Sequence, residues 1–204
     1  KTPIAIWIAR HYAAAGLVPG VLLRGYGGDE TLVHQHAVPG AVVIADPDRA
    51  AGAERALANG AQVLVLDDAY QRLDIRRDLN ILVMSAETTR AVRWPLPAGP
   101  WRESWHALER ADAVVVTRKR ATVEAARTLA DDLHQRTGVP VAIAYLGLHW
   151  LTGLVSGNRA AAASMAGKRV VAASGIADPD AFVAQVNGTG AAVQVATWKD
   201  HHDY

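Results

Sequence analysis

The chain has 204 residues, of which 50% are hydrophobic and 20% are charged, and its formal net charge is +1. This composition is typical of an ordered globular protein with a sizeable core, built as one domain or as one domain and part of a second. The near-neutral charge gives no indication of nucleic-acid binding. Without cysteine, the chain has no disulfide, thiolate metal site or cysteine nucleophile. No apolar run approaches the roughly 18 residues that indicate a membrane span.

The chain opens with Lys1, Thr2 and Pro3, and the apolar stretch that follows predicts a helix over residues 4–15. A Lys-Thr pair just before a helix is typical of the end of a P-loop, where the lysine contacts the β- and γ-phosphates and the hydroxyl binds Mg²⁺. The dipeptide alone is a weak signal. Because the chain does not begin with Met, we expect the glycine-rich part of such a loop to lie upstream of residue 1.

Residues 18–23 predict a strand that runs into a glycine-rich turn carrying Arg24 and Asp29. Glycines let the backbone approach a phosphate or adopt positive φ angles. Arg24 is therefore a candidate anion contact and Asp29 a candidate base. The alternative is a flexible turn with solvated charges.

Residues 63–66 form a short, wholly apolar run that ends in Asp67 and Asp68. Such a run predicts a parallel strand buried on both faces, and ligands bind beyond the carboxyl ends of such strands. In phosphoryl-transfer proteins an aspartate at this place holds Mg²⁺, because this hard cation prefers oxygen ligands. Apolar strands ending in Asp are common, so solvated carboxylates that cap the next turn are the alternative.

Charged residues also follow later predicted strands. Arg76 and Arg77 are candidate contacts for an anionic substrate, although ion pairs with neighbouring aspartates are the simpler account. Residues 94–103, rich in proline, predict an ordered loop that brings Arg102 and Glu103 to a helix over residues 104–110. Glu103 could equally favour the positive end of that helix. The cations at residues 118–120 could bind phosphate or be solvated.

The alternation of strands, turns and helices predicts an α/β fold with a mostly parallel sheet flanked by helices. Further strands are expected over residues 41–45, 79–84, 113–117, 141–145, 169–173 and 192–196, and further helices over residues 50–58, 121–136 and 181–186. A mixture of Gly, Ser and Ala at residues 151–167 predicts a linker. It would separate a core domain at residues 1–150 from the start of a smaller α/β domain at residues 168–204.

The chain ends with His201 and His202 between Asp200 and Asp203. These side chains could bind a metal, although neighbouring residues seldom both reach one ion. A histidine oriented beside an aspartate base is a second reading. A terminal surface cluster is the third.

Taken in order, these motifs resemble tetraacyldisaccharide 4′-kinase, the lipid A kinase of Gram-negative bacteria. The residues that carry the resemblance are Lys1-Thr2-Pro3, Arg24-Gly25-Tyr26-Gly27, Gly28-Asp29-Glu30, Asp67-Asp68-Ala69-Tyr70-Gln71, Arg77-Asp78-Leu79, residues 96–100 with Arg102 and Glu103, residues 174–177 with Pro179 and Phe182, and residues 200–204. The resemblance implies a P-loop NTPase-like core. It also implies transfer of the ATP γ-phosphate to the 4′-hydroxyl of a tetraacylated glucosamine disaccharide 1-phosphate.

The resemblance assigns roles to individual residues. It implies Asp29 as catalytic base with His201 as its partner. The residues implied at the nucleotide are Lys1, Thr2, Asp67, Asp68 and Glu103, with Thr2, Asp67 and Glu103 also at the metal. The residues implied at the lipid head group are Arg24, Arg49, Gln71 and Arg102. The implied cofactors are ATP and Mg²⁺, and the implied partners are the lipid A precursor and the cytoplasmic face of the inner membrane, with no nucleic acid.

The sequence departs from the family pattern at two places. Arg72 stands where the family has a histidine, and the loop between Arg24 and Asp29 is shorter than in the family. Two alternatives are therefore kept: a P-loop kinase with a different acceptor, and a nucleotide-binding relative without turnover.

Overall fold

The computed structural model describes residues 1–25, 29–88, 94–99 and 101–199. Its helices are α1 (Thr2–Ala14), α2 (Asp29–Ala37), α3 (Arg49–Ala58), α4 (Val123–Thr137) and α5 (Pro179–Asn187), with short 3-10 helices η1 (Ala86–Thr88), η2 (Trp105–Arg110) and η3 (Ala162–Met165). Its strands are β1 (Pro19–Leu23), β2 (Val42–Ala45), β3 (Val63–Leu66), β4 (Ile81–Ser85), β5 (Ala113–Arg118), β6 (Val141–Tyr145), β7 (Trp150–Thr152), β8 (Arg159–Ala161), β9 (Arg169–Ser174) and β10 (Ala192–Thr197). The predicted α/β class with mostly parallel sheets is confirmed.

The chain divides into two compact units. Unit 1 comprises Lys1–Val83 with Arg110–Ala113, and unit 2 comprises Met84–Glu109 with Val114–Tyr204. Residues 151–167, predicted as a linker, contain β8, η3 and part of β7. The division into a core domain, a linker and a second domain stays a prediction.

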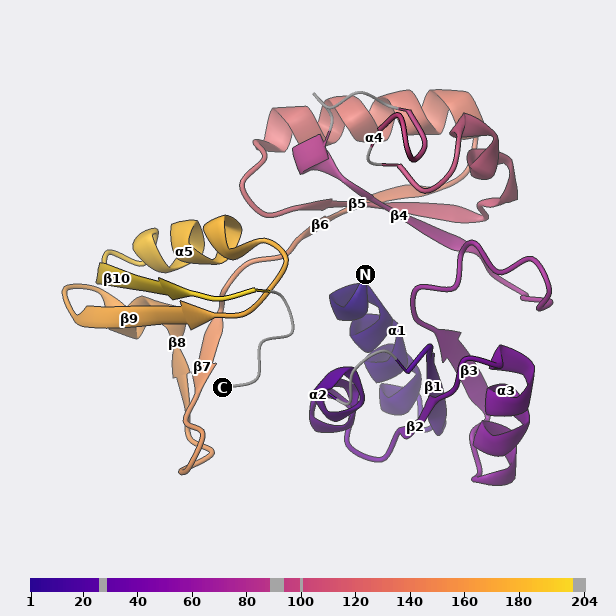
Figure 1. The fold of residues 1–204 in the computed structure, drawn as a ribbon, viewed down its shortest axis with the longest axis horizontal. Coiled ribbons are helices and arrows are strands. Elements are labelled where there is room, and N and C mark those ends of the chain that lie inside the picture. Colours follow the sequence, from indigo (N-terminus) through magenta and orange to yellow (C-terminus); the bar gives the residue numbers. More distant parts are fainter. Residues whose placement is uncertain (26–28, 89–93, 100, 200–204) are drawn as a thin grey trace. The chain divides into compact units, whose positions relative to one another are not determined.

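Unit 1 is built on a parallel sheet in the order β2-β1-β3, with β1 in the centre (Figure 1). Alternate residues of β1 serve two different cores. Val21 and Leu23 pack with Ala5 and Ala9 of α1, whereas Leu22 packs with Ala56 of α3. Because successive side chains of a strand point to opposite faces, α1 and α3 cover opposite faces of the sheet. This double coverage explains why the β1 sequence is apolar throughout.

The helix α2 is not expected from the sequence, which predicts only a turn around Asp29. The segment has few apolar residues and no clear apolar stripe, so periodicity does not reveal it. In the structure the helix begins at Asp29 and includes His34, which is completely buried. Asp29 and Glu30 lie in its first turn, where carboxylates interact favourably with the helix dipole.

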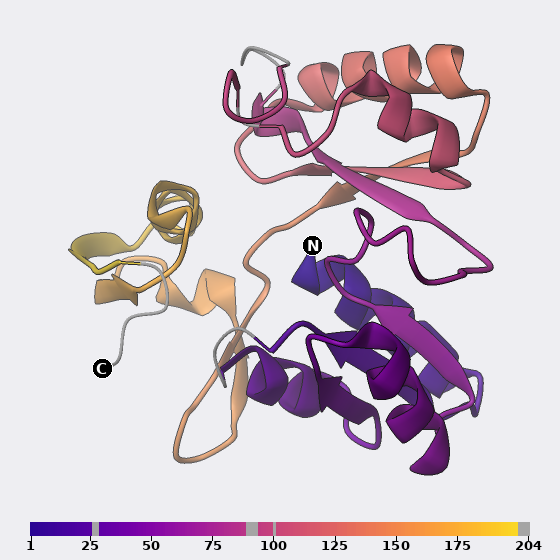
Figure 2. The same ribbon diagram turned by 45° about the vertical axis from the view of Figure 1, so that its right-hand side comes forward.

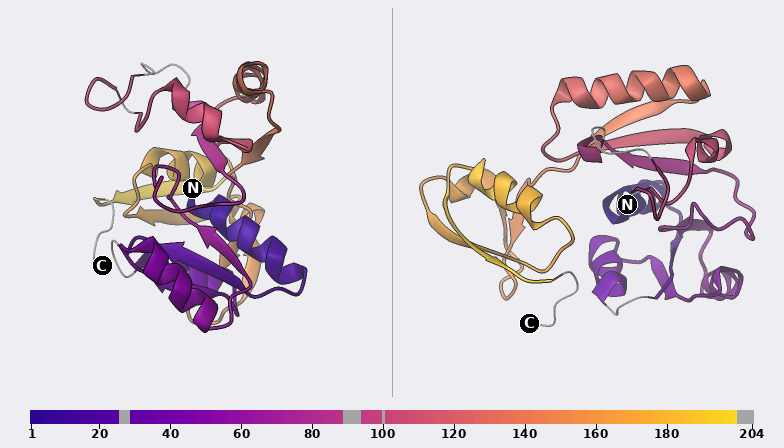
Figure 3. Two further views of the ribbon diagram at one scale, coloured as in Figure 1. Left: turned by 90° about the vertical axis from the view of Figure 1, so that its right-hand side faces the viewer. Right: turned by 45° about the horizontal axis from the view of Figure 1, so that its top comes forward.

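Unit 2 contains two parallel pairings and a short hairpin. One sheet has the order β4-β5-β6, with the first three residues of β4 assigned to unit 1, and α4 contacts β6 (Figure 2). The strands β9 and β10 pair in parallel and carry α5, as the right-hand view of Figure 3 shows. The strands β7 and β8 pair antiparallel. Residues 104–110, expected as a helix, form the shorter 3-10 helix η2.

The helix α4 ends at Gly138, whose φ of +68° is the left-handed conformation that glycine adopts at little cost. Among the described residues, no helix combines the length and the apolar character needed to cross a membrane.

Replacing Leu22 by Ala should lower the free energy of unfolding by about 2–5 kcal/mol, because the lost side chain leaves a cavity in a close-packed core. Leu22 is 1% exposed, whereas Leu57 on α3 is 54% exposed and provides the matched control. Leu57→Ala should change the free energy by less than about 0.5 kcal/mol. Urea denaturation followed by circular dichroism compares the two variants, and equal effects would contradict the packing described for β1.

Candidate functional site

The carboxyl ends of β1, β2 and β3 gather most of the polar residues that the sequence singles out in unit 1. The three strands are parallel, so they end at the same edge of the sheet. Arg24 follows β1, Arg49 starts the helix after β2, and Asp67 follows β3. This is the edge at which open α/β sheets bind ligands.

Lys1 and Asp68 meet at this edge, although they lie far apart in the sequence. The ammonium Nζ of Lys1 is 2.7 Å from Oδ1 of Asp68, and both side chains are partly exposed. Asp68 has a φ of +52°, in the left-handed region that Asp tolerates better than most residues. The structure thus brings together the two motifs that suggested a phosphate site from the sequence.

Thr2 is the first residue of α1, directly after Lys1. The first turn of α1 contains no acidic residue, and Lys1 makes no side-chain cap of the helix. The backbone N–H groups and the dipole of a helix start favour negative charge. Lys1 and Thr2 therefore lie at a helix start that favours an anion, and their contact with a nucleotide stays a prediction.

The side chain of Asp67 contacts α2. Its Oδ2 lies 3.2 Å from Nε2 of His34, and both side chains are buried. Sequence reasoning missed His34, because nothing in the pattern around it indicates burial. The consecutive aspartates therefore have different surroundings, one buried against a histidine and the other partly exposed beside a lysine.

Arg49 is buried at the same edge and is 3% exposed. Its Nη1 donates to the carbonyl of Asp46 and its Nη2 to the carbonyl of Asp67, each over 3.3 Å. Burial, together with the nearby positive charge of Arg72, lowers the pKa of Arg49, while Asp67 and Asp68 act in the opposite direction. Arg49 thus fixes the backbone after β2 to the backbone after β3, and its predicted contact with substrate stays a prediction.

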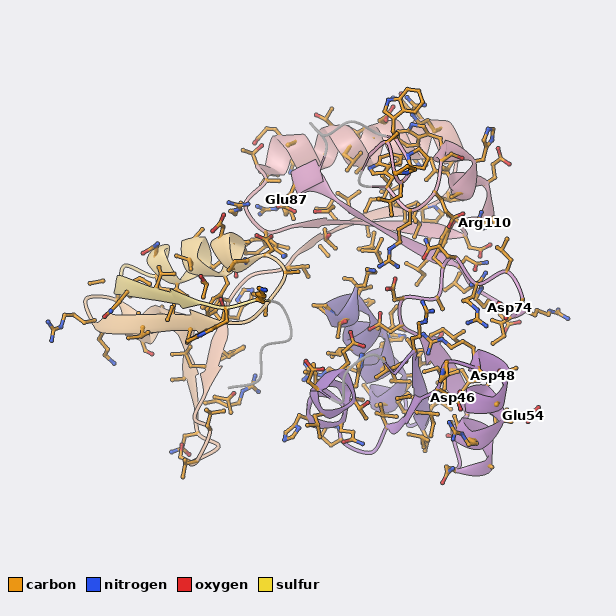
Figure 4. The ribbon with its side chains drawn as sticks, viewed as in Figure 1. Asp46, Asp48, Glu54, Asp74, Glu87 and Arg110 are labelled. Carbon is orange, nitrogen blue, oxygen red and sulfur yellow. The ribbon has the colours of Figure 1, made fainter. Side chains whose placement is uncertain are left out.

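Other arginines lie near this edge. Arg24 is exposed and close enough to Arg49 to contribute to the lowering of its pKa. Arg72 pairs with Asp74 over 2.6 Å, and its hydrogen bond is the main reason why the pKa of Asp74 falls to about 2 (Asp74 is labelled in Figure 4). Arg77 donates to the carbonyl of Ala69 over 2.6 Å rather than forming an ion pair with Asp74.

For several predicted site residues, no contact with Lys1, Asp67 or Asp68 is described above. Gln71 is exposed in unit 1, and Asp29 is exposed at the start of α2. Arg102 and Glu103 belong to unit 2. His201 lies outside the residues that the structure describes. The roles of these residues stay predictions.

Unit 2 contains a carboxylate that the sequence did not single out. Oε1 of Glu87, a residue labelled in Figure 4, accepts hydrogen bonds from the backbone N–H groups of Lys119, Arg120 and Ala121 over 2.7, 3.0 and 2.9 Å. The hydroxyl of Ser85 donates to Oε2 over 2.7 Å. The loop after β5 therefore already binds an internal anion.

The surroundings of Glu87 shift its acidity. Burial raises the pKa of Glu87, but the hydrogen bonds from the loop and from Ser85 outweigh it and hold the pKa at about 2. Of the cations in this loop, Lys119 pairs with Asp178 over 3.0 Å. Its ammonium group is therefore held by a carboxylate of the same chain.

The residues at the edge of unit 1 suit a magnesium ion bound together with a nucleotide. Among the described residues there is no cluster of three His, Cys, Asp or Glu that could hold a metal unaided. Mg²⁺ does not require one, because it keeps several waters and is commonly bound by one or two carboxylates and the phosphates of its substrate. The carboxylate of Asp67 and the hydroxyl of Thr2 are hard oxygen donors of this kind.

A helix that starts directly after a lysine, beside a parallel strand that ends in two aspartates, is consistent with an α/β protein of the P-loop NTPase-like class. The comparison with known families specifies this class further. The family model for tetraacyldisaccharide-1-P 4′-kinase matches residues 1–204, and the chain belongs to this family.

Individual relatives agree with this assignment. The whole chain aligns with tetraacyldisaccharide 4′-kinases of Anaeromyxobacter dehalogenans, with 34% identity over 60% of that protein, and of Syntrophus aciditrophicus, with 32% identity over 63%. A tetraacyldisaccharide 4′-kinase of Geobacter metallireducens is 34% identical over 65% of its length. The chain thus spans less than two thirds of these relatives. No solved structure matches it significantly.

Replacing Glu87 by Gln should destabilise the protein at neutral pH by about 2 kcal/mol, because three backbone donors lose a charged acceptor. The folded-state pKa of about 2 lies below the ordinary value of 4.5, so the stabilisation is complete above pH 4.5 and is lost as the pH falls toward 2. The difference between wild type and variant should therefore shrink over that interval.

Chemical denaturation at a series of pH values measures this effect. Glu54 of α3, an exposed carboxylate labelled in Figure 4, provides the control variant Glu54→Gln, for which we expect no comparable loss. A gap between wild type and Glu87→Gln that stays constant down to pH 2 would contradict the assignment.

Proposed function

We propose that the protein transfers the γ-phosphate of ATP to the 4′-hydroxyl of tetraacyldisaccharide 1-phosphate, with Mg²⁺ as cofactor. The main support is family membership along the whole chain, combined with the 2.7 Å contact between Lys1 and Asp68 at the end of β3. This contact joins the two motifs that a P-loop kinase needs for its nucleotide. Transfer breaks the bond from the γ-phosphorus to the ADP oxygen and forms one to the sugar oxygen.

The nucleotide would bind at the start of α1. Lys1 would contact the phosphoryl oxygens, and the hydroxyl of Thr2 and the carboxylate of Asp67 would hold Mg²⁺. When bound, Mg²⁺ neutralises negative charge on the phosphates. Lys1 would exchange its contact with Asp68 for the more highly charged phosphates, which leaves Asp68 available to the ion or its water. In this proposal Glu103 also serves the nucleotide and the metal.

The acceptor hydroxyl needs a base, because its oxygen attacks more readily as its proton leaves. We assign this role to Asp29, which takes the proton at a carboxylate oxygen, and assign His201 as its partner. Support for Asp29 comes from its exposed position in the first turn of α2, the helix that also contacts Asp67 through His34. Arg24, Arg49, Gln71 and Arg102 complete the proposal as contacts for the anionic head group.

The test uses the full-length parent protein in detergent, with labelled ATP and tetraacyldisaccharide 1-phosphate. Wild type should form a labelled lipid, and Asp29→Asn should reduce the rate by at least about 100-fold, because general-base catalysis contributes about 10²–10⁴-fold. Nucleotide binding should persist in the variant. Glu54→Gln, which also neutralises an exposed helix carboxylate, should keep the wild-type rate.

The outcomes separate the alternatives. Nucleotide turnover without labelled lipid would favour a P-loop kinase with a different acceptor. Nucleotide binding without any transfer would favour a relative that has lost turnover. Full activity of Asp29→Asn would remove Asp29 as the base while leaving the kinase assignment intact.

We also propose that the protein associates peripherally with a membrane surface, at the cytoplasmic face of the bacterial inner membrane. Support comes from the hairpin of β7 and β8, whose tip carries the fully exposed side chains Leu154 and Val155. Trp150 at the base of the hairpin is 58% exposed, and the centroid of its ring lies 5.3 Å from the guanidinium carbon of Arg159. Trp and Arg suit the boundary between lipid and water.

The charge of this segment supports the same proposal. No Asp or Glu occurs between Tyr145 and Asp178, whereas Arg159, Lys168 and Arg169 do. A surface with anionic lipids would attract these cations while the apolar tip enters its outer layer.

Replacing both Leu154 and Val155 by Ser should weaken binding of the full-length protein to anionic phospholipid vesicles by about tenfold, because two buried apolar side chains would be lost. Vesicle co-sedimentation measures the effect. Leu73→Ser, at a position 69% exposed in unit 1, is the control and should bind as wild type does. Unchanged binding of the double variant would remove the hairpin from the membrane contact.

A further inference from the structure

His34 is the one buried residue of α2, and its surroundings set it apart from an ordinary core position. Its exposed fraction is 0%, yet it carries two polar ring nitrogens. Nε2 lies 3.2 Å from Oδ2 of Asp67, and Nδ1 has no hydrogen-bond partner in the structure as described. An aliphatic residue would fill an apolar interior without leaving a polar atom unsatisfied. The contact with Asp67 is the feature that an aliphatic residue would not provide.

The direction of this hydrogen bond follows from its chemistry. A carboxylate oxygen only accepts hydrogen bonds, so Nε2 carries the proton and donates it to Oδ2. Such a bond with an ionised acceptor is stronger than one between neutral groups. It fixes the rotation of the Asp67 carboxylate and directs Oδ1 elsewhere.

Asp67 is held by its backbone as well as by its side chain. Nη2 of the buried Arg49 donates to the carbonyl oxygen of Asp67 over 3.3 Å. The carbonyl is thereby fixed from α3, on one face of the sheet, and the carboxylate from α2. Asp68, by contrast, is partly exposed and paired with the partly exposed Lys1. Of the two aspartates, Asp67 is the one whose orientation is fixed before any ligand arrives.

We propose that His34 is a positioning residue that orients the carboxylate of Asp67 toward the divalent cation of a bound nucleotide. The proposal rests on the proposed function, because it takes the end of β3 as the metal and nucleotide site. His34 touches neither nucleotide nor metal in this arrangement. It acts by holding Oδ2, which leaves Oδ1 to face the ion or one of its waters.

Three replacements separate this role from simple packing. Leu keeps an apolar side chain of moderate size and removes the donor. In Gln, the amide nitrogen is as many bonds from Cβ as Nε2 is in His, so the hydrogen bond to Asp67 can be kept. In Asn, the amide nitrogen corresponds to Nδ1 and falls short of Asp67. Gln and Asn therefore form a matched pair of amides that differ only in reach.

The experiment measures binding of a fluorescent ATP analogue to the full-length protein over a range of Mg²⁺ concentrations, and again without Mg²⁺. Loss of an outer contact to a metal ligand commonly weakens metal affinity by about 10–100-fold. His34→Leu and His34→Asn should therefore raise the Mg²⁺ concentration needed for half-maximal enhancement of binding by at least about tenfold. His34→Gln should stay within about threefold of wild type on the same scale. Binding without Mg²⁺ should be similar in all four proteins, which also checks that each variant is folded.

The possible results distinguish a positioning role of His34 from a packing role and from failure of the proposed nucleotide site. An unchanged Mg²⁺ requirement in His34→Leu, or a loss in His34→Gln as large as in His34→Leu, would overturn the positioning role and leave His34 as a packing residue. If wild type itself binds the analogue without any response to Mg²⁺, the proposed nucleotide site fails, and the inference fails with it. A loss confined to binding without Mg²⁺ would also contradict the proposal.

Discussion

The burial of the β2-β1-β3 sheet on both of its faces is the constraint on which unit 1 depends. With α1 against one face and α3 against the other, the central strand β1 is buried along its whole length and has no solvent-facing side on which polar residues could stand. Polar side chains are therefore displaced to the strand ends. At the carboxyl edge they meet the start of α1, where backbone N–H groups favour negative charge. The double coverage thus produces a stable sheet and, at the same edge, a place suited to a phosphate group.

The two aspartates at the end of β3 have different partners and different exposure. Residues of a strand alternate between its faces, and the chain turns immediately after β3 through the left-handed conformation of Asp68. Asp67 therefore faces α2 and is buried, while Asp68 faces Lys1 and stays partly exposed. In the proposed site, the rigid carboxylate of Asp67 would fix the geometry at the metal, and Lys1 would exchange its contact with the more accessible Asp68 for a phosphate. Arg49 stabilises the end of β3 by hydrogen bonds that join the backbone after β2 to the backbone after β3.

In unit 2, backbone N–H groups after a strand bind a carboxylate of the chain itself. The loop after β5 presents consecutive backbone N–H groups, which in another protein would form an anion site. Here Glu87 supplies the anion from within the chain, and its pKa of about 2 records how strongly the loop favours the charged form. A row of cations after a strand is therefore no sufficient indication of a phosphate site. The decisive question is whether an internal carboxylate already occupies the backbone donors.

The sequence by itself determined the parallel α/β class, the strand at residues 63–66 and the start of a helix after Lys1. These features follow from local physics, because a continuous apolar run can only be a buried strand or helix segment, and glycine and proline mark its ends. The order of the motifs along the chain also indicated the family. By contrast, α2, the burial of His34 and the internal role of Glu87 were decided only by the tertiary structure. Their causes are contacts between residues distant in the sequence, 34 with 67 and 87 with 119–121, and no local pattern encodes such pairs.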